Sequence, residues 1–299
     1  MNRNLPNLSC DCHTHVFGPK GQYPYALARQ YTPEDASIEA LLALGTSIGT
    51  QRVVIVQPSP YGADNRCTVD ALIRINTQNQ AADHGVQGDK ARGVAVIDEA
   101  TTDKSLQAMH AAGVRGIRLN LETSGVSDPA YAEQLFRWSA GRVAHLDWHL
   151  QMYTTLPVLA SLAPAIRDTG VPVVVDHFCR ANAKLGVSQA HLDTLLGLVQ
   201  QGFVWVKLSA AQRISELPDC EDVKPIAQAL IAANPDRMLW GSDWPHPGAK
   251  PGQIRRPEVI ESFNDVDDKR AIERIVLWTG DDVTRQKIFV SNPERLYDF

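Results

Sequence analysis

The feature that most constrains this chain is a series of eight short apolar segments, each separated from the next by enough residues for one helix. Continuously apolar segments are typical of parallel strands that are covered on both faces. Their alternation with helical stretches indicates an α/β fold, and eight strand–helix units predict a closed (β/α)₈ TIM barrel. We expect residues 1–299 to form this barrel as one domain. The predicted strands span residues 8–15, 52–59, 91–97, 116–121, 149–154, 171–177, 204–210 and 238–243.

Length and composition agree with this prediction and exclude several classes of protein. A chain of 299 residues with 44% apolar residues is normal for one barrel with a large core. The net charge of −5 and the lack of a basic run argue against a nucleic-acid partner. The longest apolar stretches are strand-sized, so no membrane span is expected. The N-terminus lacks the apolar core of a signal peptide, and the five cysteines are expected to be free thiols, so we expect a cytoplasmic protein. We expect it to be a monomer or a small homo-oligomer.

Local signals also predict where helices begin and end. Thr32, followed by Pro33, has the pattern of a helix N-terminus. Thr102 is predicted to begin a second helix, which Gly113 ends. The segment 247–254 is rich in Pro and Gly and predicts a loop.

The candidate functional residues are the polar ones that interrupt the apolar pattern at strand ends. In barrels of this kind, active sites lie at the C-terminal ends of the strands. The first strand ends in Asp11-Cys12-His13-Thr14-His15, and alternation places Asp11, His13 and His15 on one face, with Cys12 on the other. Neutral imidazoles at this spacing can bind one metal ion or one substrate oxygen. A network of satisfied structural polar groups is the alternative.

Other strands end in the same way. Polar groups follow most of the remaining strands, which is hard to explain as core filling alone. These groups are Ser59, Arg118, Asn120, Gln151, Tyr153, Asp176, His177, Lys207, Ser209 and Asp243.

The segment His13-Thr14-His15, together with His177 and Asp243, resembles the signature of the amidohydrolase superfamily. Segments 13–19 and 240–247 resemble the branch that hydrolyses lactones, such as the 2-pyrone-4,6-dicarboxylate lactonases of bacterial aromatic-compound degradation. The resemblance covers the whole chain. It implies a carboxylic-ester hydrolase of EC 3.1.1 type that opens a small acidic lactone.

The resemblance also implies a set of substrate-binding residues, and one of its matches fails. The family carries a further arginine soon after the Arg118 motif, where residues 121–125 of this chain read Leu-Glu-Thr-Ser-Gly. Because arginine binds a carboxylate through two parallel hydrogen bonds, a second carboxylate of a pyrone substrate lacks this partner. A 4-sulfomuconolactone hydrolase with one zinc ion therefore stays open as an alternative. The implied substrate-binding residues are Tyr31, Ser59, Arg118, Tyr153, Arg180, Arg213 and His246.

Hydrolysis of a lactone needs a base for water and an electrophile for the carbonyl oxygen. We assign Asp243 as the base, with His13, His15 and His177 polarising the carbonyl, directly or through a metal. Superfamily members with two metals use a carboxylated lysine or acid on the fourth strand and a histidine on the fifth, which this chain lacks. A two-metal site is therefore not expected. The resemblance to pyrone lactonases, which work without divalent metal, implies that no cofactor is required, and the alternative is one Zn²⁺ bound by these three histidines and Asp243.

Three other functions remain open on the same barrel. A sugar-lactone isomerase or hydrolase would use a similar pocket. A zinc-dependent decarboxylase of aromatic acids would need firm metal binding. A non-catalytic binding barrel would keep its ligand when the proposed base is replaced.

Overall fold

The predicted TIM barrel is confirmed by a computed structural model, which describes residues 5–81, 90–249 and 254–299. Eight parallel strands form one sheet in the order β1-β3-β4-β5-β6-β7-β8-β9. Each strand pairs with the next one along the barrel, as a series of strand–helix units requires. The barrel strands are β1 (Cys10–Thr14), β3 (Arg52–Val56), β4 (Ala91–Ala95), β5 (Val114–Asn120), β6 (His149–Tyr153), β7 (Val173–Val175), β8 (Val204–Ser209) and β9 (Met238–Gly241).

The first and last strands close the barrel through backbone hydrogen bonds at their C-terminal ends. The amide of Asp243 donates to the carbonyl of His13 at 2.8 Å, and the amide of His15 donates to the carbonyl of Trp244 at 2.8 Å. Residues of the candidate site therefore lie on the seam itself, and barrel closure fixes their spacing.

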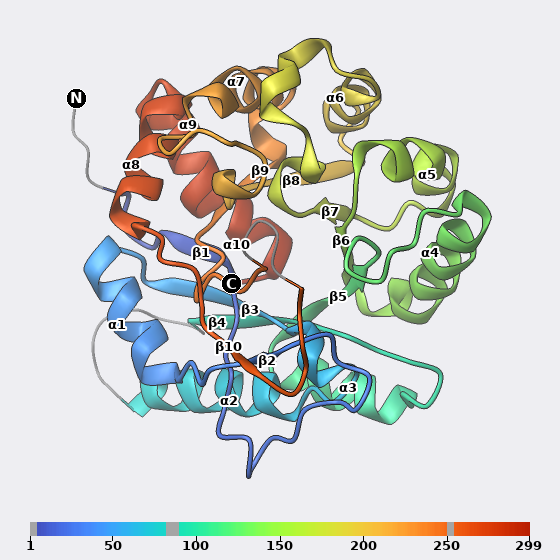
Figure 1. Ribbon diagram of the computed structural model, residues 1–299, viewed down its shortest axis with the longest axis vertical. Coiled ribbons are helices and arrows are strands. Elements are labelled where there is room, and N and C mark those ends of the chain that lie inside the picture. Colours follow the sequence, from blue (N-terminus) through green and yellow to red (C-terminus); the bar gives the residue numbers. More distant parts are fainter. Residues whose placement is uncertain (1–4, 82–89, 250–253) are drawn as a thin grey trace.

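Helices surround the strands on the outside of the barrel (Figure 1). None of those in the described part of the chain is long and apolar enough to cross a membrane. The helices are α1 (Ile38–Ile48), α2 (Arg66–Ala81), α3 (Asp103–Ala111), α4 (Pro129–Val143), α5 (Leu156–Thr169), α6 (Leu192–Gln200), α7 (Lys224–Ala233), α8 (Asp268–Thr279), α9 (Asp282–Gln286) and α10 (Asn292–Tyr297).

The predicted helix start at Thr102 is confirmed, whereas the one at Thr32 is wrong. The Thr102 side chain accepts from the Ser105 amide at 3.1 Å, and Gly113 follows helix α3 with a φ of 104°. Thr32 instead lies in the short strand β2 (Thr32–Pro33), which pairs in parallel with β10 (Ile260–Glu261). Its hydroxyl donates to the Pro257 carbonyl at 2.5 Å, so this tertiary contact outweighs the local capping signal.

Strand β1 departs from the simple alternation that the sequence predicted. Its register against β3 shifts between Asp11 and Thr14. Cys10 and Cys12 pack with valines of β3 and β7 inside the barrel, and His13 also points inward toward the site. The Asp11 carboxylate accepts the backbone amide of Ser242 at 2.9 Å. A bulge in β1 thus re-aims the histidines and is held by the neighbouring strand.

Because β1 and β9 pack closely at the seam, adding one methyl group at Gly241 should lower the free energy of unfolding. A Cβ on Gly241 would lie 2.6 Å from Cβ and 2.7 Å from the backbone nitrogen of His13. We expect Gly241→Ala to lower the free energy of unfolding by about 1–3 kcal/mol, because β1 and β9 must separate to admit it. Urea denaturation followed by circular dichroism measures this change.

Gly141→Ala is the matched control, because this glycine lies in helix α4 with nothing within 4 Å of its added Cβ. Replacing an exposed helical glycine by alanine should be neutral or stabilising by up to about 1 kcal/mol. Equal denaturation midpoints for Gly241→Ala and the parent protein would contradict the closed seam.

Candidate active site

The centre of the site is the carboxylate of Asp243, which three histidines surround. Its Oδ1 lies 3.7 Å from Nε2 of His13, 3.7 Å from Nε2 of His15 and 3.6 Å from Nε2 of His177. These residues come from the C-terminal ends of the first, sixth and eighth barrel strands, and all are buried. The structure brings together the four residues that the sequence analysis assigned to catalysis.

Hydrogen bonds on the far side of two imidazole rings orient them toward Asp243: Nδ1 of His15 contacts the Val56 carbonyl, and Nδ1 of His177 lies 2.8 Å from Oγ of Ser209. Nδ1 of His15 lies 2.8 Å from the carbonyl of Val56, which can only accept, so Nδ1 carries the proton. Burial lowers the pKa of His15, and it lowers the pKa of His177 to about 4, so both rings are neutral near pH 7. Nε2 of His15 therefore presents a lone pair to the site.

Arg213 neutralises the central carboxylate from the opposite side. Its Nε and Nη2 lie 2.8 Å and 2.7 Å from Oδ2 of Asp243, and Nη2 also donates to the carbonyl of Pro247. Burial alone would raise the pKa of Asp243, but the adjacent Arg213 guanidinium holds it well below its usual range. Asp243 is therefore ionised, with Oδ1 free to face the histidines.

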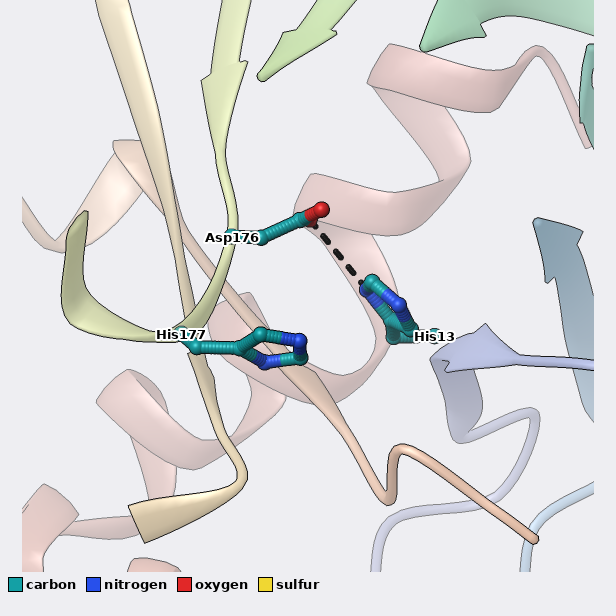
Figure 2. A group of neighbouring side chains, drawn as sticks. All are labelled: His13, Asp176 and His177. Atoms are coloured by element: carbon teal, nitrogen blue, oxygen red, sulfur yellow. Dashed lines mark ion pairs between the residues drawn. The ribbon is translucent and has the colours of Figure 1, made fainter. Parts of the chain in front are cut away.

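A second buried carboxylate lies beneath the three histidines. Oδ1 of Asp176 lies 3.2 Å from Nδ1 of His13 and 3.7 Å from Nζ of Lys207. Figure 2 shows Asp176 and His177 following strand β7, with Asp176 directed at His13. Gln151 connects the pair, because its amide nitrogen donates to Asp176 at 3.1 Å and its oxygen accepts from Lys207 at 2.6 Å.

The donor atoms fit one zinc ion better than two. Nε2 of His13 is buried and has no hydrogen-bond partner in the described part of the chain. It lies within 4.8 Å of the ligand atoms that His15 and Asp243 offer, and nitrogen and carboxylate donors in this number suit zinc. A second possible group includes Asp176, but its Oδ1, the oxygen that faces His13, is also the one nearest to the Lys207 ammonium, whereas Arg213 contacts Asp243 at Oδ2 and leaves Oδ1 to the histidines.

A cavity of about 260 Å³ opens onto Asp243, His15 and His177. Five of the seven residues expected to bind substrate line it: Tyr31, Ser59, Arg118, Tyr153 and Arg213.

Arg118 is the least satisfied charge in this cavity. Its side chain is 8% exposed, and its Nε is buried without a hydrogen-bond partner among residues 5–81, 90–249 and 254–299. The nearest carboxylate oxygen in its ion pair, Oδ2 of Asp176, is 3.6 Å away. Burying an N–H group without an acceptor costs free energy of folding. Arg118 is therefore suited to an anion that enters the cavity and accepts from it.

The other two expected residues, Arg180 and His246, line an adjacent cavity of about 550 Å³ instead. The two cavities share Tyr153 and Arg213. Arg180 donates to the carbonyl of Arg213 at 2.5 Å, and Nε2 of His246 lies 3.2 Å from a carboxylate oxygen of Asp268.

Two residues of the site, Arg255 and Asp176, had no role predicted from the sequence. Arg255 lines the smaller cavity and stacks over the ring of Tyr31, with its guanidinium carbon 4.0 Å from the ring centroid. It follows a segment that reads only as a loop, so the sequence held no signal for it. Asp176 did carry a signal, its place beside His177 at a strand end.

Comparisons with known proteins agree with this geometry. The sequence matches the Amidohydrolase family over residues 10–299. It is 34% identical to 4-sulfomuconolactone hydrolase from Rhizobium radiobacter, over 98% of this chain and 91% of that one. It is 36% identical to 2-pyrone-4,6-dicarboxylate hydrolase from Comamonas testosteroni, again over 98% of this chain and 91% of the relative.

Solved structures show the same fold. A structure from Pseudomonas putida assigned as a 2-pyrone-4,6-dicarboxylic acid hydrolase is 29% identical, with a TM-score of 0.78 over 98% of both chains. An amidohydrolase from Burkholderia multivorans with bound zinc has a TM-score of 0.65 over 98% of this chain and 99% of that one, and at 19% identity it is alike in fold alone. On the family match and the full-length relatives, this chain belongs to the amidohydrolase family.

Proposed function

We propose that this protein is a lactone hydrolase whose substrate is a small lactone bearing at least one carboxylate or sulfonate, in the breakdown of aromatic compounds. The observation that carries the proposal is Nε of Arg118, which is buried without a hydrogen-bond partner among the described residues and belongs to a side chain that lines the same cavity as Asp243. The relatives named above support it, because the names of both describe hydrolases of acidic lactones.

In the proposed reaction, Asp243 activates water. Oδ1 of Asp243 accepts a proton as the water oxygen bonds to the lactone carbonyl carbon, which gives a tetrahedral intermediate. The ring C–O bond then breaks, and Asp243 returns the proton to the leaving oxygen. Arg213 holds Oδ2 at 2.8 Å, so Oδ1 is the atom that exchanges the proton.

The carbonyl oxygen needs a positive partner, and His15 cannot supply one in its neutral form. Its proton is on Nδ1, directed at Val56, so Nε2 can accept but cannot donate. This favours the single-zinc alternative over the metal-free one, with His13, His15, His177 and Asp243 as the residues that would hold the ion. When bound, zinc would polarise the carbonyl and lower the pKa of water.

Arg118 orients the substrate. A carboxylate or sulfonate that accepts from its free donors would be paired in a site where the charge is otherwise poorly compensated. Because the anion is distant from the scissile bond, its binding energy is available for positioning the carbonyl beside Asp243. The proposed function is tested directly with 2-pyrone-4,6-dicarboxylate, 4-sulfomuconolactone and a neutral sugar lactone; opening of the neutral lactone alone would contradict it.

The first prediction for this site concerns the base. Asp243→Asn should lower kcat/KM by about 10²–10⁴-fold, because a positioned proton acceptor is lost. Asp168→Asn is the control, since this carboxylate is 68% exposed and pairs with Arg137 on the surface. Circular dichroism checks folding. A rate for Asp243→Asn within about threefold of the parent would remove this residue from the mechanism.

A second prediction concerns metal content. Protein purified without chelator should contain at most one zinc ion per chain by elemental analysis, since Lys207 disfavours a cation beside Asp176. His15→Ala should weaken zinc binding measured by competition with a chromophoric chelator, because it removes a donor already oriented by Val56. Two tightly held ions per chain, or unchanged affinity in the variant, would contradict the assignment.

A third prediction concerns substrate charge. The methyl ester of an acidic substrate should have a kcat/KM at least about 30-fold below that of the free acid, because Arg118 loses an ionic partner. Arg118→Met should narrow this ratio by slowing the acid more than the ester. Arg66→Met, at a 62% exposed surface position, should leave the ratio unchanged. Equal kcat/KM values for the acid and its ester in the parent protein would contradict a role for Arg118 in substrate binding.

A further inference from the structure

The cavity holds a third arginine that the mechanism above does not use. Its lining residues include Arg118, Arg213 and Arg255. Arg213 is paired with Asp243 through both its Nε and Nη2 atoms. If Arg118 takes one acidic group of the substrate, then Arg255 is the remaining cation among the described lining residues.

The guanidinium of Arg255 has hydrogen-bond donors that its one ion pair does not use. Its Nη2 donates to Oε1 of Glu261 at 2.6 Å, but its Nε is buried and has no partner in the described ranges. The guanidinium carbon lies over the Tyr31 ring, 4.0 Å from its centroid, which is within the range of a cation–π contact. Stacking leaves the edge of a guanidinium available for a planar or tetrahedral anion.

Several long-range contacts hold Arg255 beside Tyr31. Strands β2 and β10 pair Glu261 with Pro33. The carbonyl of Pro257 accepts from Nη2 of Arg29 at 3.0 Å and from the hydroxyl of Thr32 at 2.5 Å. The segments on either side of the stacked pair are thus tied together, and the arginine is not a free surface side chain.

Another part of the cavity wall disfavours a second anion. Glu122 and Thr123 line it, in the segment where the arginine expected from the family resemblance is missing. The carbonyl of Thr123 accepts from the side chain of Gln30 at 2.7 Å, and Glu122 adds a negative charge partly offset by Arg180 at 3.7 Å.

We propose that Arg255, stacked on Tyr31, is a specificity-determining residue that binds the second acidic group of a lactone with two such groups. This inference rests on the proposed function and specifies its substrate as doubly acidic. Arg118 binds one anion, and Arg255 binds the other from the side of the cavity formed by Tyr31.

The test uses two pairs of lactones whose members differ by one acidic group. These are 2-pyrone-4,6-dicarboxylate with 2-pyrone-6-carboxylate, and 4-sulfomuconolactone with muconolactone. For the pair that the parent enzyme opens, Arg255→Met should raise KM for the doubly acidic member by about 10- to 100-fold, because a charge-assisted, bidentate contact is lost. KM for the singly acidic member should change less than about threefold, and kcat for either should change little.

The neighbouring Arg256→Met is the matched control, since this arginine is exposed and carries the same charge. It should leave both KM values unchanged, and Arg255→Lys should recover only part of the loss. A KM for the doubly acidic lactone unaffected by Arg255→Met, or equal losses for both members of the pair, would overturn the inference. Failure of the parent to open any of the four lactones would instead refute the proposed function.

Discussion

The ion pair between Arg213 and Asp243 is the interaction on which the site depends. A buried carboxylate surrounded by neutral imidazoles would become protonated without a cation, and a protonated Asp243 could not accept a proton from water. Arg213 prevents this by holding Oδ2 at 2.8 Å and leaves Oδ1 to the three histidines. The same pairing makes Asp243 a weak base, because the adjacent guanidinium stabilises its ionised form.

Charge is arranged in two layers on the two sides of His13. Nε2 faces Asp243, whose counter-charge is Arg213, and Nδ1 faces Asp176, whose counter-charge is Lys207. Each of these two buried carboxylates thus has a cation beside it, fully buried in the case of Lys207 and partly exposed in the case of Arg213, and pairing is the condition under which such charges are tolerated. The two layers differ in which carboxylate oxygen the cation contacts: Lys207 is nearest to Oδ1 of Asp176, which faces His13, whereas Arg213 contacts Oδ2 of Asp243 and leaves Oδ1 to the histidines.

The grouping of the four candidate residues was predictable because a barrel places the C-terminal ends of all its strands at one rim. The strand pattern alone was enough to predict that the barrel brings together His13, His15, His177 and Asp243. The shape of β1 was not predictable in the same way. Alternation groups Asp11 with the histidines, but the register shifts beyond it, and its carboxylate accepts the amide of Ser242 instead. Such a bulge depends on the partner strands, which no local pattern records.

The position of Arg255 could not be predicted from local sequence patterns, because long-range contacts determine it. Thr32 and Pro33 carry a helix-start signal, yet the threonine hydroxyl bonds to a carbonyl 225 residues away. That contact, with the β2–β10 pairing, brings a loop without periodicity against Tyr31. Asp243, His13 and His15 lie on the barrel seam and His177 follows strand β7, whereas this loop would bind the second anion. Substrate choice can therefore change through residues 254–261 while the hydrolytic geometry at Asp243 stays the same.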